Sequence, residues 1–95
     1  EEALNDYMAF LSSSSLSTAQ HFILDFLDKH PQIMQAQLHL INLKWQMGQV
    51  HEAKFMYLNC LNQSSAQAKN IFEINPKLLD DSDFLHLTDD LWILN

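Results

Sequence analysis

The sequence is poor in the residues that interrupt regular structure. Its 95 residues include one glycine, two prolines, one cysteine and no arginine. One glycine and two prolines are too few for the many tight turns of a β fold, and the Asn-Gly, Asp-Gly and Gly-Gly pairs of hairpins are absent. Apolar residues make up 47% of the chain, which is enough to build a core. The composition therefore predicts an all-α domain.

Charge and cysteine content restrict the partners and the compartment. The formal net charge is −7, and all five basic residues are lysines. Because neutralisation of phosphates by basic side chains drives nucleic-acid affinity, we expect no nucleic-acid binding. Cys60 has no partner for an internal disulfide, and no apolar run approaches the roughly 18 residues that span a membrane. We expect an intracellular protein, cytoplasmic or nuclear, with no membrane contact and Cys60 as a buried structural thiol.

Helical periodicity is clearest in the segment 34–61, on both sides of Gly48. Before the glycine, two groups of apolar residues recur on opposite faces of a helix: Met34, Leu38, Ile41 and Trp45, and Ala36, Leu40, Leu43 and Met47. A polar strip lies between them: Gln35, His39, Asn42 and Gln46. After the glycine a single apolar stripe follows: Ala53, Met56, Tyr57, Cys60 and Leu61. This pattern predicts a helix packed on two sides, joined by a tight turn to a helix packed on one side.

The same unit recurs upstream, with Ala19 placed 34 residues before Ala53. Residues at family positions of a known repeat are Gly48, Glu52, Ala53, Tyr57, Cys60 and Leu61, with Ala19, Phe26, Leu27 and Pro31 in the upstream copy. The segment 1–67 thus resembles the tetratricopeptide repeat, whose period is 34 residues. The first helix of the central pair departs from the family pattern around 38–44. The resemblance implies antiparallel helical hairpins stacked as a short α-solenoid.

We divide the chain into hairpins at 1–33 and 34–67 and a divergent C-terminal helical cap at 68–95. About six helices are predicted. They cover 2–11, 16–30 with His30 buried, two helices in 34–61 joined at Gly48, 66–74, and a last helix in which Phe84, Leu87, Leu91 and Leu94 recur; a polar turn is expected at 12–15. Ser15 or Ser17, and later the segment 81–83, supply caps. A standard third repeat is not expected, because Pro76 would fall inside its first helix. The helix-like opening at Glu1 suggests a fragment of a larger protein.

Catalytic and metal-binding patterns are missing. The acidic residues Asp80, Asp81, Asp83, Asp89 and Asp90 lack the glycine and the distal glutamate of a calcium loop, so capping and a solvated face explain them better. The five histidines include no pair at i, i+4 and no H-E-x-x-H motif, and no phosphate loop or CxxC pair occurs. We predict no enzymatic activity, no metal and no cofactor.

A surface for another protein remains as the function. In tetratricopeptide arrays the first helix of each pair lines a concave groove that holds peptide segments. The resemblance places the following residues in that groove: Gln35, Leu38, Asn42, Trp45 and Gln46, with Glu1, Leu4 and Met8 in the upstream copy. Asn42 and Gln46 would hold a ligand backbone and Trp45 would anchor it. In the alternative interpretation Trp45 belongs to the core and the amides are merely solvated.

The expected function is therefore a non-enzymatic scaffold that docks a peptide or partner subunit within a larger complex. The alternative is a self-association module. Two repeats are fewer than the three or so usually needed for stability, so exposed helical faces need a cover. Leu91, Trp92 and Leu94 would form this second contact, either folded back as a cap or in a homo-oligomer.

Overall fold

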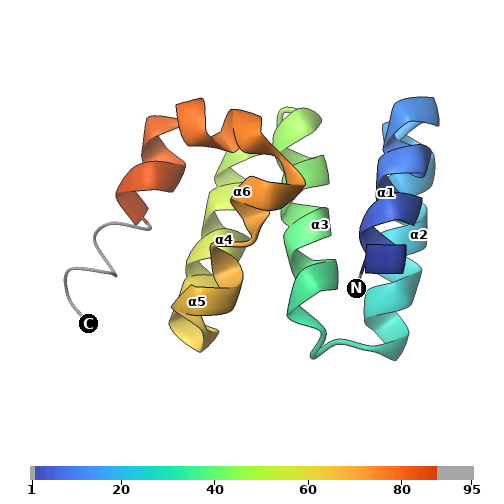
Figure 1. Ribbon diagram of the computed structural model, residues 1–95, viewed down its shortest axis with the longest axis horizontal. Coiled ribbons are helices and arrows are strands. Elements are labelled where there is room, and N and C mark those ends of the chain that lie inside the picture. Colours follow the sequence, from blue (N-terminus) through green and yellow to red (C-terminus); the bar gives the residue numbers. More distant parts are fainter. Residues whose placement is uncertain (1, 88–95) are drawn as a thin grey trace.

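Helices account for the regular structure of the described part of the chain. The structure, a computed structural model, describes residues 2–87 (Figure 1). Its elements are α1 Glu2–Ser14, α2 Leu16–Lys29, α3 Met34–Gln46, α4 Val50–Gln63, α5 Ser65–Ala68, α6 Ile71–Ile74 and the 3₁₀-helix η1 Pro76–Asp80. A further helical stretch covers 82–87. The all-α fold class is confirmed, and residues 2–87 contain no strand.

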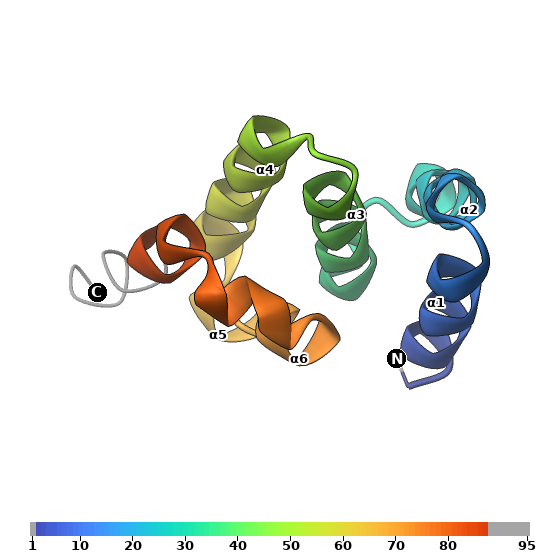
Figure 2. The same cartoon turned by 90° about the horizontal axis from the view of Figure 1, so that it is seen from above.

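Helix α3 is the centre of the fold. It contacts α1 and α2 on one side and α4, α5 and α6 on the other, as the view from above shows (Figure 2). The two apolar faces predicted from the sequence enter two different core clusters. Leu38 and Ile41 belong to the cluster shared with α4 and the C-terminal elements, whereas Ala36, Leu40 and Leu43 belong to the cluster shared with α1 and α2. The prediction of a helix packed on two sides is therefore confirmed.

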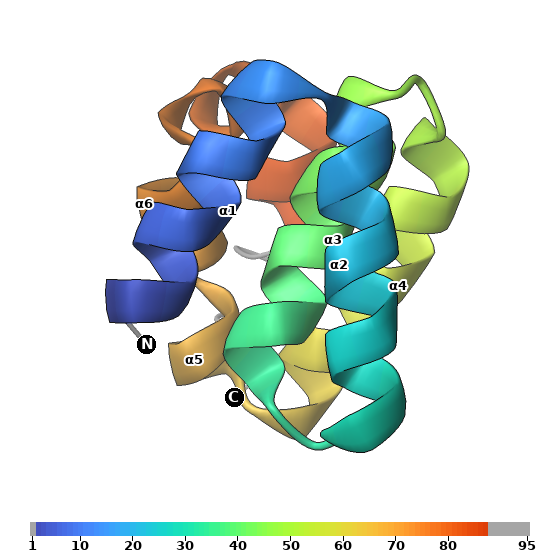
Figure 3. The same cartoon turned by 90° about the vertical axis from the view of Figure 1, so that its right-hand side faces the viewer.

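Consecutive long helices run antiparallel, α1 against α2 and α3 against α4 (Figures 1 and 3). The bounds of α2 and α4 are related by one constant offset, since Leu16 and Val50 are 34 residues apart and so are Lys29 and Gln63. Ala19 and Ala53 occupy equivalent positions, and both are fully buried. The second helix of each pair therefore repeats in length and in the place of its small buried residue.

Local chemistry sets the ends of the long helices. The Ser15 hydroxyl accepts a hydrogen bond from the Thr18 amide and caps α2, so Ser15 rather than Ser17 is the cap. Gly48 turns the chain between α3 and α4 with φ +87°, a left-handed conformation that glycine adopts without the steric cost of a Cβ. The α3–α4 turn therefore depends on the only glycine of the chain.

Three local predictions were wrong. The first helix does not stop at the serines but continues to Ser14, because the hydroxyls of Ser13 and Ser14 donate back to the Phe10 carbonyl. The helix expected at 66–74 is broken at Lys69 and Asn70 into α5 and α6. His30 is exposed rather than buried, since it lies at the C-cap of α2.

The C-terminal elements pack against α3 and α4. Asp81 caps the stretch 82–87 by accepting from the amides of Asp83 and Phe84, and the Phe84 side chain is fully buried. Lys54 of α4 forms an ion pair with Asp83 and lowers the pKa of its carboxyl group. Among residues 2–87, every helix is too short or too polar to cross a bilayer.

Candidate functional site

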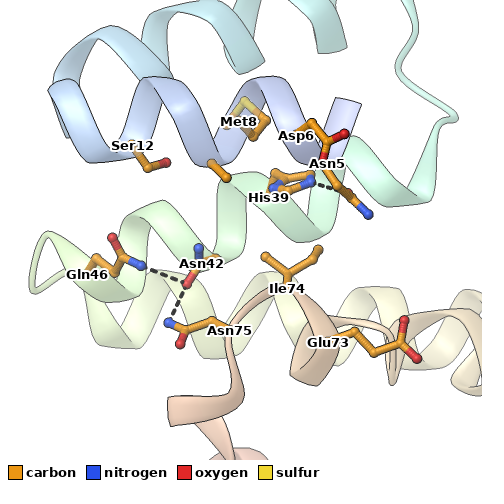
Figure 4. Close-up of a pocket in the computed structure, with 11 residues that line it drawn as sticks. Asn5, Asp6, Met8, Ser12, His39, Asn42, Gln46, Glu73, Ile74 and Asn75 are labelled. Carbon is orange, nitrogen blue, oxygen red and sulfur yellow. Dashed lines mark hydrogen bonds between the residues drawn. The ribbon is translucent and has the colours of Figure 1, made fainter. Parts of the chain in front are cut away.

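A pocket of about 410 Å³ lies where α1, α3 and the junction of α6 with η1 converge (Figure 4). All three elements face this space with mostly polar side chains. The lining residues are Asn5, Asp6, Met8, Ala9, Ser12, His39, Asn42, Gln46, Glu73, Ile74 and Asn75. The polar strip of α3 forms one wall, because the two apolar faces of that helix are already occupied by the two core clusters.

One hydrogen-bond network joins α1 to α3 beside the pocket. The Asn5 Oδ1 atom accepts from Gln35 Nε2 at 2.7 Å and lies 2.6 Å from His39 Nε2. Because an amide oxygen only accepts, the imidazole carries its proton on Nε2 and leaves Nδ1 as an acceptor. Burial without a charged partner lowers the pKa of His39 to about 4. The histidine is therefore neutral at neutral pH.

Acid should destabilise the protein through His39. The pKa of His39 is about 4 in the folded state, below the ordinary value of 6.5. The unfolded chain therefore takes up the proton first. The contribution of neutral His39 to the free energy of unfolding is complete above pH 6.5 and is lost as the pH falls toward 4. By pH 5 the loss is about 2 kcal/mol.

Urea unfolding between pH 7.5 and about 5 measures this loss, and His39→Gln provides the matched control. Glutamine keeps an N–H donor for Asn5 but does not titrate. We expect the variant to lose about 2 kcal/mol less than the wild type over this range. Parallel pH profiles for the two proteins would contradict the role of His39.

A second network joins α3 to the segment that follows α6. Asn42 Oδ1 accepts from Asn75 Nδ2 at 2.7 Å and from Gln46 Nε2 at 3.2 Å (Figure 4). Asn75 is 8% exposed and also accepts from the Lys77 amide, which caps η1. Asn5 and Asn75 were not predicted as site residues. For Asn75 a signal existed, because an asparagine before a proline is typical of a turn or cap.

Several polar atoms of the pocket wall have no protein partner among residues 2–87. Asn42 is 7% exposed and His39 is 4% exposed, yet neither Asn42 Nδ2 nor His39 Nδ1 forms a hydrogen bond within this part of the chain. No fully buried side-chain nitrogen or oxygen there lacks a partner, so these two atoms are accessible to solvent, and both of their residues line the pocket. The wall offers one donor and one acceptor, a turn of α3 apart.

The predicted groove residues are only partly brought together. Asn42 and Gln46 line the pocket, and Gln35 lies beside it through its bond to Asn5. Leu38 is fully buried in the core and does not line the pocket. Trp45 packs against the core cluster that contains Leu38, and its Nε1 donates to Asp81 Oδ2 at 2.9 Å. The position of Trp45 agrees with the alternative interpretation, a core tryptophan.

The remaining candidates take structural positions or lie outside the described residues. Cys60 is buried, its thiol donates to Gln37 Oε1 at 3.3 Å, and burial raises the pKa of this thiol to about 11. Within 2–87 no three histidine, cysteine or acidic side chains gather in a way that could hold a metal ion. Glu1 lies outside the described residues. So does the predicted second contact, which consists of Leu91, Trp92 and Leu94.

Comparisons with known proteins leave the fold and the pocket as the basis for assigning a function. No family model matches the sequence, and neither the curated proteins nor the solved structures include a match.

Proposed function

We propose that this chain is a non-enzymatic protein-interaction module of tetratricopeptide type, and that the pocket between α1, α3 and α6 binds an extended peptide segment of a partner protein. The single observation that carries the proposal is the wall of α3. Its buried Asn42 and His39 turn an open donor and an open acceptor toward the pocket. An extended peptide presents N–H and C=O groups that match such a pair.

The arrangement of the helices supports the same proposal. The 34-residue offset between α2 and α4, with fully buried Ala19 and Ala53 at equivalent positions, is the period of a tetratricopeptide repeat. α1 and α3, the first helices of the two hairpins, both line the pocket, as the first helices of such repeats do. The segment α5–α6 takes the place of a third first helix, in a broken form.

Filling the pocket should abolish binding. Ala9 is exposed and lines the pocket near the middle of α1, so Ala9→Trp places a large side chain there without disturbing the core. Peptides of about ten residues, roughly 35 Å long when extended, are first selected against the wild-type protein from a random displayed library. Fluorescence anisotropy then measures their affinity, and we expect Ala9→Trp to raise Kd at least about tenfold.

The matched control is Ala3→Trp, which changes another exposed alanine of the same helix that does not line the pocket. It should leave Kd within about twofold of the wild-type value. Equal binding by Ala9→Trp and the wild type would overturn the proposal, as would failure of the library to yield any binder.

A second candidate function is self-association. It is favoured by large apolar side chains that stay exposed on the outer helices, with Phe10 at 65% and Tyr7 at 46% on α1 and Phe55 at 66% on α4. Sedimentation equilibrium tests it directly. A mass that rises with concentration and falls in a Phe10→Ser or Phe55→Ser variant supports self-association, and a concentration-independent monomer rejects it.

A further inference from the structure

The carboxylate and ammonium side chains that line the pocket are of one sign only, negative. Asp6 of α1 and Glu73 of α6 contribute carboxylates to its lining, and none of the five lysines lines it. Three of the lysines are paired with carboxylates outside the pocket lining: Lys29 with Asp25, Lys44 with Glu52 and Lys54 with Asp83. The whole chain carries a net charge of −7, which adds to the negative potential at this face.

Besides its carboxylates, the pocket has a buried hydrogen-bond donor on the α3 wall. Asn42 is more than nine-tenths buried, and its Nδ2 atom has no acceptor among the described residues although its Oδ1 atom accepts two hydrogen bonds. The two bonds to Oδ1 fix the orientation of the amide, so the Nδ2 donor is held in place toward the pocket (Figure 4). A fixed, unfilled donor of this kind suits a carbonyl oxygen of a bound peptide.

The pocket lining also has an apolar part. Met8 is almost fully buried, Ala9 is exposed, and Ile74 is half-buried, and all three line the pocket. Their surfaces can accept a small apolar side chain or the methylene stem of a lysine or arginine, whose charged head stays near water. Carboxylates, an amide donor and a short apolar surface are thus combined in one site.

We propose that the occupant of the pocket is an extended peptide segment that carries a lysine or arginine, with the cationic group placed at the carboxylate of Asp6 on α1 or of Glu73 on α6 and the peptide backbone bound by Asn42. The inference rests on the proposed function and adds the chemistry of the partner. An acidic segment is disfavoured at the same site because Asp6 and Glu73 repel it and no lysine lines the pocket.

The test uses peptide arrays whose members share one degenerate background of about ten residues, with lysine, arginine, glutamate or leucine fixed at the central position. The proteins are the wild type, an Asp6→Asn/Glu73→Gln variant and an Asp25→Asn/Asp28→Asn control. Both double variants change the net charge equally, and Asp25 and Asp28 lie on α2, which does not line the pocket. Circular dichroism verifies that all three proteins keep their helicity.

The wild type and the α2 control should bind the lysine and arginine sets at least about fivefold more tightly than the leucine set, and the glutamate set most weakly. Asp6→Asn/Glu73→Gln should bring the lysine, arginine and leucine sets within about twofold of one another. In about 1 M salt, where the Debye length is about 3 Å, the wild-type preference should shrink in the same way.

A glutamate preference, or a lysine preference that Asp6→Asn/Glu73→Gln leaves unchanged, would overturn the inference. Binding without any charge preference that Ala9→Trp still abolishes would also overturn it, yet the proposed peptide-binding function would stand. Binding of no set by any protein would overturn both proposals. The array therefore separates failure of the charge argument from failure of the pocket.

Discussion

Tyr57→Ala is expected to lower the free energy of unfolding by about 3 to 5 kcal/mol, as large-to-small changes of buried aromatic residues do. Tyr57 is fully buried in the cluster that joins α3 and α4 to the C-terminal elements. Its ring lies 5.0 Å from that of Phe84 and 6.3 Å from that of Phe72. Alanine leaves a cavity where α4, α6 and the stretch 82–87 meet. Domains of this size are stable by only about 5 to 15 kcal/mol.

Phe55→Ala is the matched control, because Phe55 lies two residues away on α4 but is 66% exposed. Urea unfolding followed by circular dichroism should place this control within about 0.5 kcal/mol of the wild type. If the two variants lost equal stability, or if Tyr57→Ala cost less than Phe55→Ala, the cluster around Tyr57 could not be the core of the C-terminal half.

Ala53→Leu and Ala19→Leu are each expected to cost about 1 to 3 kcal/mol through overpacking. Both alanines are fully buried at equivalent positions of α4 and α2, each in a different core cluster. At each position the added carbons of leucine must displace neighbouring side chains or push the helices apart, because the interior is already close-packed.

Ala9→Leu is the control for this pair, since Ala9 is exposed near the middle of α1 and leucine has a helix propensity close to that of alanine. Thermal and urea unfolding should show little change for the control and similar losses for the two buried sites. Tolerance of leucine at Ala53 but not at Ala19 would argue against equivalent hairpins.

The sequence predicts the centre of this fold well, because α3 carries its packing information in its own periodicity. Two apolar faces and a polar strip can be read directly from residue spacing, and the structure uses each of them as expected. The caps at Ser15 and Asp81 and the turn at Gly48 follow from local chemistry in the same way. Met47 departs from the pattern, since at the end of α3 it is 39% exposed.

The errors arise where several local outcomes are close in energy. Serines can end a helix or bond back to its carbonyls, and Ser13 and Ser14 take the second course. No glycine or proline at Lys69 and Asn70 predicts the break between α5 and α6. Both short helices instead pack against α3. Tertiary packing decided the break at 69–70, and local sequence does not encode it.

Only one wall of the site could be predicted from the sequence, because the other residues come from distant parts of the chain. The spacing of His39, Asn42 and Gln46 reveals one polar wall, but its partners Asn5 and Asn75 lie more than 30 positions away on either side. Trp45 was placed in the groove by the resemblance, whereas its indole meets Asp81, another long-range contact. Contacts of this kind follow from the way the helices pack.

The most direct test of peptide binding in the pocket is amide chemical-shift mapping of the isotope-labelled protein with a peptide selected from the random library. We expect the perturbed amides to cluster on the pocket elements, at 5–12 of α1, 39–46 of α3 and 73–75 near the end of α6, and Ala9→Trp to remove these shifts. Shifts confined to the outer surface around Phe55 and Leu87, or around Tyr7 and Phe10, would contradict it and assign binding to another face of the molecule.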